Sequence, residues 1–126
     1  MPKSIMHDVA AARKAVQPIT AEELQAILGR EDVLVVDVRD APELIATGKI
    51  PGALNVSRGT LEFQADDTMP THNAAFARDK TVVVYCASGA RAALCGRALQ
   101  DLGYPNVRNL GSLKAWTDAG GPVEND

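Results

Sequence analysis

One cysteine lies at a point of the sequence where a thiol can react. Cys86 directly follows Thr81–Tyr85, a β-branched run that predicts a buried strand, and it precedes a helical pattern over residues 91–102. Free backbone N–H groups in the first turn of a helix stabilise anions, so this position favours the thiolate form of Cys86. Because the thiolate is the reactive form of cysteine, the position predicts a nucleophile.

The residues between this strand and this helix are small. They let the backbone curl so that successive amides point inward as an anion-binding nest, and an arginine then closes the rim with a fixed charge. The alternative is that Cys86 only packs, as most free cysteines do. The coincidence of strand end, helix start and arginine favours a catalytic cysteine with a substrate-binding loop made of Ala87, Ser88, Gly89, Ala90 and Arg91.

Other charged residues have more ordinary interpretations beside their functional ones. Asp37 ends the apolar run that begins at Val33, and we expect it to support the active loop by accepting hydrogen bonds. Arg58 either binds the anionic end of a substrate or faces solvent from a loop. Arg39 is expected to pair with Glu43, four residues further along.

The second cysteine and the two histidines do not form a metal-binding pattern. Cys95 lies on the helix after the loop, where packing is the default role and a resolving thiol that forms a disulfide with Cys86 is the alternative. His7 and His72 are isolated, and two cysteines are too few for a disulfide framework or a zinc site. We therefore expect no metal and no organic cofactor.

The order of the elements indicates an α/β fold with a mainly parallel sheet. Strands are predicted at 33–38, 81–85 and 107–110, and residues 50–56 are expected to enter a short strand after a Pro-Gly turn. Helices are predicted at 4–16, from Thr20 to Gly29, from Pro42 to Thr47, at 91–102 and at 112–119. Residues 57–73 show no regular pattern. We expect an N-terminal helical extension over residues 1–17 and one domain over 18–126, with Asp37 and Cys86 at the same edge of the sheet, where ligands bind in such folds.

Charge and hydropathy exclude two classes of partner. The 126-residue chain has a formal net charge of -3 and carries no dense basic stripe, so nucleic acid is not expected. The first twenty residues are interrupted by charges, and no stretch approaches eighteen apolar residues. We expect a cytoplasmic protein that does not bind membranes, and its oligomeric state stays open.

Four blocks of sequence resemble the rhodanese superfamily over about residues 18–123. They are Asp37-Val-Arg39 with Glu43, residues 48–56, Tyr85 to Arg91, and residues 109–116 followed by Gly120-Gly-Pro122. The resemblance implies a three-layer domain with a five-stranded sheet. It also implies a sulfurtransferase that moves a sulfane sulfur from thiosulfate or a similar donor to cyanide or a thiol through a Cys86 persulfide, with a sulfur-acceptor protein as a further candidate partner.

Two other functions fit parts of this pattern. A rhodanese-like binding module without activity would not need Cys86, Gly89 and Arg91 together. A phosphatase or arsenate reductase of the related type has five residues between its cysteine and arginine, whereas four separate Cys86 from Arg91 here. Arg91 is also the only cation in the loop, and Lys49 stands where the family often has histidine, so the sequence does not identify the sulfur donor.

Overall fold

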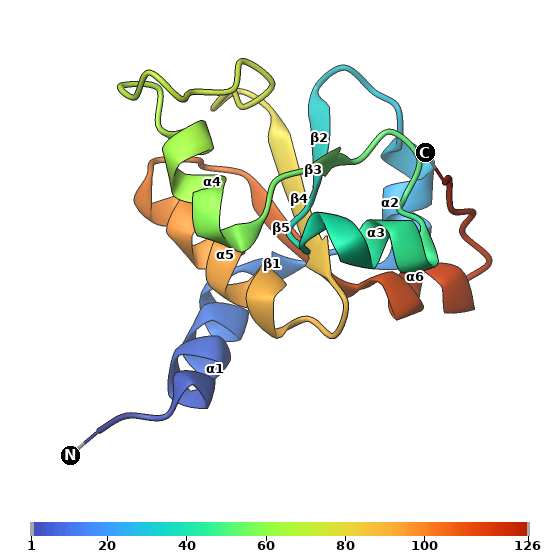
Figure 1. The fold of residues 1–126 in the computed structure, drawn as a ribbon, viewed down its shortest axis with the longest axis horizontal. Helices are drawn as coiled ribbons and strands as arrows, with labels where there is room; N and C mark the ends of the chain where they lie inside the picture. Colours follow the sequence, from blue (N-terminus) through green and yellow to red (C-terminus); the bar gives the residue numbers. More distant parts are fainter. Residues whose placement is uncertain (1, 126) are drawn as a thin grey trace.

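A sheet of five parallel strands forms the centre of the computed structural model, which describes residues 2–125 (Figure 1). The strands are β1 (Gln17–Pro18), β2 (Val33–Asp37), β3 (Leu54–Asn55), β4 (Thr81–Cys86) and β5 (Val107–Ser112), in the order β1-β5-β4-β2-β3. β4 is therefore the middle strand. Its residues from Val82 to Cys86 are fully buried, as expected for a parallel strand covered on both faces.

Helices cover both faces of this sheet. They are α1 (Ile5–Ala15), α2 (Ala21–Ile27), α3 (Ala41–Thr47), α4 (Arg58–Ala65), α5 (Ala90–Asp101) and α6 (Leu113–Asp118). Alternate residues of β4 enter different cores: Val82 and Val84 pack with α4 and α5, while Val83 and Tyr85 pack with α2 and α6. These three layers confirm the predicted α/β fold. No helix within residues 2–125 has the length and apolar character needed to cross a lipid bilayer.

The predicted helix starts are confirmed by their caps. Ser4 accepts the backbone N–H of Met6 at 3.2 Å. Thr20 and Glu23 form a reciprocal capping box. The Thr20 hydroxyl accepts the backbone N–H of Glu23 at 3.0 Å, and the Glu23 carboxylate accepts the backbone N–H of Thr20 at 2.9 Å. Local sequence therefore sets where α1 and α2 begin.

Two elements differ from the prediction. Residues 58–65 form α4 within the segment that showed no regular pattern, because Gly59 and the lack of a side-chain cap hide a helix whose Leu61 and Ala65 are buried. β1 was not predicted, since its two residues include Pro18, which has no backbone N–H. β1 pairs with β5, so the boundary predicted after residue 17 falls inside a strand.

The sheet register brings the predicted site residues to one edge. Asp37 lies beside Tyr85 in neighbouring parallel strands, and Cys86 follows as the last residue of β4. The prediction that Asp37 and Cys86 share the carboxyl edge of the sheet is confirmed. This edge is where open α/β sheets bind their ligands.

Candidate active site

The side chain of Cys86 is completely buried and held by two backbone amides. Its Sγ accepts hydrogen bonds from the N–H of Gly89 at 3.0 Å and from the N–H of Ala92 at 3.4 Å. Donors aimed at one sulfur atom stabilise negative charge on it without a neighbouring base. The arrangement therefore suits a thiolate nucleophile, and it would equally suit the anion formed when a second sulfur atom is attached.

The turn from β4 into α5 passes through Gly89, whose φ of 105° lies in the region that favours glycine. Of the predicted loop residues, only Gly89 donates its amide to Sγ. Within residues 2–125, the amides of Ala87, Ser88, Ala90 and Arg91 make no hydrogen bond to this sulfur. Ala92 was missed because the loop was taken to end at Arg91. The amide of Ala92 could have been predicted as a donor, because the first N–H groups of a helix have no partner within the helix and α5 begins at Ala90.

The guanidinium of Arg91 is bound to the carboxylate of Glu43 in α3. The contacts are 2.7 Å from Nη1 to Oε1 and 2.8 Å from Nη2 to Oε2, which is the bidentate geometry of a strong ion pair. The hydrogen bonds from Arg91 lower the pKa of Glu43 to about 2, and those to Glu43 raise the pKa of Arg91 above its usual range. Arg91 thus connects α5 to α3, and its charge is balanced.

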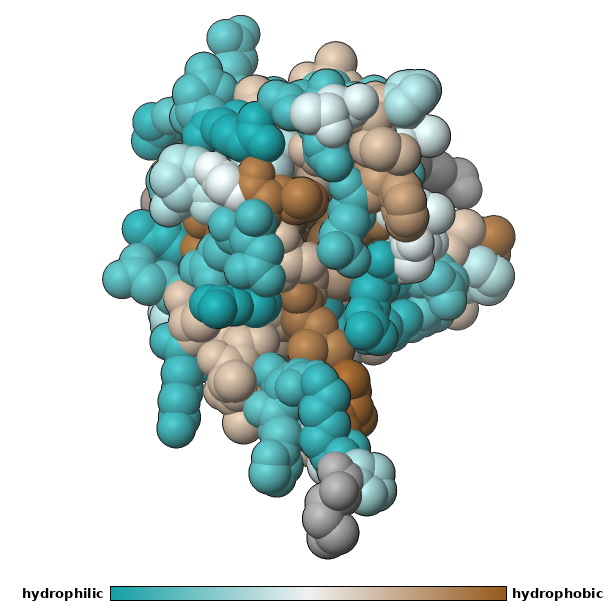
Figure 2. Space-filling view, turned by 90° about the vertical axis from the view of Figure 1, so that its left-hand side faces the viewer, coloured by the Kyte–Doolittle hydropathy of each residue, from teal (hydrophilic) through white to brown (hydrophobic). Residues whose placement is uncertain are grey.

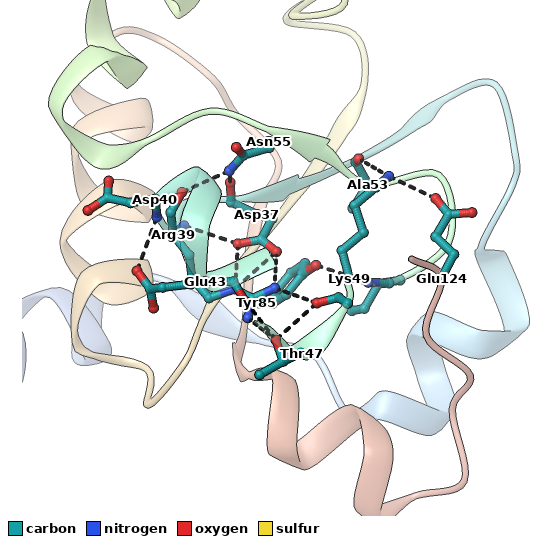
Figure 3. A network of polar contacts seen from close by, with 12 residues as sticks. Asp37, Arg39, Asp40, Glu43, Thr47, Lys49, Ala53, Asn55, Tyr85 and Glu124 are labelled. Atoms are coloured by element: carbon teal, nitrogen blue, oxygen red, sulfur yellow. Dashed lines mark hydrogen bonds and ion pairs between the residues drawn. The ribbon is translucent and has the colours of Figure 1, made fainter. Parts of the chain in front are cut away.

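The predicted pair between Arg39 and Glu43 is wrong, because Arg39 is bound to Asp37 (Figure 3). Asp37 is fully buried and Arg39 is 2% exposed, so each charge needs a partner within the protein. Asp37 accepts from the backbone N–H of Arg39 at 3.0 Å and from its Nη2 at 2.7 Å. Arg39 also donates to the Thr47 hydroxyl and the Gly48 carbonyl, which connects the C-terminal end of α3 to the Asp37–Arg39 pair at the end of β2.

Asp37 therefore acts on the region through Arg39 and the neighbouring Tyr85. Burial raises the pKa of the Tyr85 hydroxyl, and interaction with Asp37 raises it further. The same hydroxyl accepts the backbone N–H of Ile50 at 3.1 Å. Within residues 2–125, the Asp37 side chain accepts hydrogen bonds from Arg39 and none from loop 86–91. A supporting role of Asp37 would therefore be exerted through Tyr85, which precedes Cys86.

A cleft of about 410 Å³ lies beside the active loop, lined by Val38, Asp40, Arg58, Gly59, Glu62 and Arg91. Arg58 is the first residue of α4, and its side chain lines this cleft. Its side chain makes no hydrogen bond or ion pair with other residues in the part of the chain that is described. Arg58 thus presents a positive charge to this cleft.

Cys95 lies on the buried face of α5 and is 2% exposed. Burial raises the pKa of its thiol to about 12, so it stays protonated at neutral pH. It also lines a larger pocket, of about 680 Å³, whose walls come from α1, α4 and α5. Figure 2 shows the face of the molecule on which these helices lie, where an apolar strip runs between hydrophilic side chains. Among residues 2–125, no three His, Cys, Asp or Glu side chains converge as a metal site would require.

The sequence model of the rhodanese-like domain matches residues 20–119. A sulfurtransferase from Allochromatium vinosum is 37% identical over 110 residues, which are 86% of this chain and 94% of that protein. The human thiosulfate:glutathione sulfurtransferase is 28% identical over 107 residues, covering 79% of this chain and 92% of the relative. The chain therefore belongs to the rhodanese-like domain family, and these relatives indicate an enzyme of the sulfurtransferase type.

Solved structures agree with this assignment of the fold. The human single-domain sulfurtransferase superimposes with a TM-score of 0.68 at 30% identity, covering 82% of this chain and 96% of that one. A protein of unknown function from Rhodopseudomonas palustris, described as a possible tyrosine phosphatase, gives a TM-score of 0.90 at 38% identity. That match covers 98% of this chain and 96% of the other, so it includes α1, which precedes the region of the family model.

Proposed function

We propose that this protein is a sulfurtransferase in which Cys86 takes the sulfane sulfur of thiosulfate or a similar donor and passes it to cyanide or a thiol. The observation that carries the proposal is the pair of amides, from Gly89 and Ala92, directed at a single buried sulfur atom. Relatives named as thiosulfate sulfurtransferases, including one from Pseudomonas aeruginosa that is 30% identical over 112 residues, support thiosulfate as the donor.

In the first step the Cys86 thiolate attacks the outer sulfur of thiosulfate. A bond forms between Sγ and that sulfur, the sulfur–sulfur bond of thiosulfate breaks, and its electron pair leaves with sulfite. The product is a persulfide anion on Cys86, and total charge is conserved. Amides that already point at the sulfur stabilise this charge without reorganising, which is the electrostatic contribution that often dominates catalysis.

In the second step an acceptor attacks the outer sulfur of the persulfide. Cyanide would leave as thiocyanate, and a thiolate attacking the protonated persulfide would leave as a persulfide of the acceptor. In both cases Cys86 returns as a thiolate held by Gly89 and Ala92. One set of donors therefore serves both halves of the reaction.

Phosphate ester cleavage is the second candidate, because the solved protein from Rhodopseudomonas palustris is described as a possible tyrosine phosphatase. Against it stand the four residues between Cys86 and Arg91 and the bidentate pairing of Arg91 with Glu43. A phosphate needs donors on several oxygen atoms, and an arginine already paired with a carboxylate supplies fewer of them. The geometry favours a single sulfur atom in the loop.

Intact-mass analysis after thiosulfate treatment tests the proposal. We expect the wild-type protein to gain one sulfur atom that cyanide removes, Cys86→Ser to gain none, and Cys95→Ser to behave like wild type. Hydrolysis of an aryl phosphate is assayed in parallel. A wild-type protein that takes up no sulfur from thiosulfate, mercaptopyruvate or polysulfide, but hydrolyses the phosphate, would replace the sulfurtransferase proposal with the phosphatase.

A further inference from the structure

An arginine from outside the family domain lies against the active loop. A Cβ atom built on Gly89 would lie 3.5 Å from Nη2 of Arg13, a residue in the last turn of α1. Gly89 is the residue whose amide lies 3.0 Å from the Cys86 sulfur. The Arg13 guanidinium therefore adds a positive charge beside the loop that holds the Cys86 sulfur, from a helix that the family model does not include.

Packing holds α1 in this position. Val9, Ala12 and Val16 are at most 2% exposed, and the first two pack with Ala93 of α5. Gly96 permits the approach of Val16, since a Cβ atom there would lie 3.2 Å from both of its γ-methyl carbons. Figure 1 shows α1 beside α5, with its amino-terminal end extending away from the sheet. Because the backbone of Arg13 is fixed, binding an anion would order its side chain alone.

The charge of Arg13 is not balanced by a partner, unlike that of Arg91. Within the described residues 2–125, neither Arg13 nor Arg58 has a side-chain hydrogen bond or an ion pair. Arg13 and Arg58 lie on different sides of β4. The Cβ position of Gly89, which is near Arg13, also lies 3.7 Å from Gly111 in β5. Arg58 instead follows β3, and the sheet order places β5 and β3 on opposite sides of β4. Asp40 and Glu62 line the same cleft as Arg58, so the positive charge of Arg58 has acidic neighbours.

We propose that Arg13 binds the anionic end of the sulfur donor and thereby selects donors that are small oxyanions with two negative charges. This inference rests on the proposed sulfur transfer for the identity of the bound anion. The Cys86 thiolate and the thiosulfate dianion repel each other before the new sulfur–sulfur bond forms. The persulfide anion and the departing sulfite dianion carry the same three negative charges afterwards. A guanidinium beside Gly89 lowers the cost of bringing them together at both stages.

Donor kinetics provide the first test. We expect Arg13→Gln to raise the KM for thiosulfate by roughly fivefold or more, with the effect shrinking at high ionic strength, as for a charge at the rim of a site. Arg13→Lys should restore part of the loss. Lys14→Gln is the matched control, because it removes the same charge from the adjacent exposed position of α1. Equal KM values for Arg13→Gln and Lys14→Gln would overturn the proposal.

A second test does not depend on sulfur transfer. In a Cys95→Ser background, Cys86 is alkylated with iodoacetate, which is an anion, and with neutral iodoacetamide of similar shape. We expect Arg13→Gln to lower the ratio of the two rates by about threefold, while Lys14→Gln leaves it unchanged. A lowered ratio without any uptake of sulfur would reject the proposed function and keep the anion site. An unchanged ratio would reject the role of Arg13.

Discussion

Glu43 and Arg91, 48 residues apart in the chain, form a bidentate ion pair with contacts of 2.7 and 2.8 Å. Glu43 also caps its own helix, because its carboxylate accepts the backbone N–H of Asp40 at 3.1 Å. One carboxylate therefore connects the start of α3 to the first turn of α5, which carries the amide of Ala92. Any substitution that breaks the contacts of Glu43 should therefore alter both α3 and α5 at the carboxyl edge of the sheet.

The stability contributed by this pair should depend on acidic pH. Glu43 titrates at about 2 in the folded protein, against an ordinary pKa of 4.5, so the unfolded chain binds more protons between these values. The contribution is complete above about pH 4.5 and is lost as the pH falls towards 2. We expect the thermal unfolding midpoint of wild type to fall more steeply across this window than that of Glu43→Gln.

Glu31→Gln is the control for this measurement, because it removes the same charge from an exposed turn residue that has no ion pair within residues 2–125. Parallel profiles for wild type and Glu43→Gln would show that the ion pair does not couple protonation to folding.

Removing one partner of the buried pair between Asp37 and Arg39 should be far more costly. Arg39→Leu leaves a fully buried carboxylate without its cation, which costs about 3–5 kcal/mol of unfolding free energy. Arg30→Leu breaks the exposed pair between Arg30 and Asp32 and should cost less than about 1 kcal/mol. Urea unfolding of both variants measures the difference, and similar losses would mean that the buried pair is not needed for folding.

Gly89→Ala tests the backbone conformation of the active loop. The added methyl group would meet Arg13 and Gly111 only at ordinary contact distances, so its cost comes from the positive φ and amounts to about 1–2 kcal/mol. We expect a lower thermal unfolding midpoint and slower persulfide formation, because relaxation of φ turns the amide away from Sγ. Gly59→Ala, at a helical glycine with open space, should not destabilise the protein.

The two cysteines should differ sharply in reactivity. The pKa of about 12 for the Cys95 thiol, and the two amides that stabilise a thiolate on Cys86, predict that iodoacetamide at pH 8 modifies Cys86 in the native protein and leaves Cys95 unmodified until the chain is unfolded. Peptide mass spectrometry after a short reaction distinguishes the two sites. Recovery of a disulfide between Cys86 and Cys95 from the native protein would instead support a resolving role for Cys95.

Local sequence determined the elements whose signals are contained within a few residues. The capping box at Thr20 and Glu23 predicted the start of α2, and the valine run before Cys86 predicted β4, because hydrogen bonds and burial patterns of this kind involve near neighbours. The helix α4 and the two-residue β1 were not predicted, since the first lacks a cap and the second exists only through pairing with β5.

The residue pattern also located Cys86 between a buried strand and a helix, and that position was enough to predict amide donors around its sulfur. The partners of the charged side chains, in contrast, were set by how distant helices pack in the folded chain. Glu43 binds Arg91 rather than Arg39, and Arg13 from α1 lies against Gly89. The reason is physical: ion pairs depend on distances of a few ångströms between helices that are far apart in the chain, and no local pattern specifies those distances.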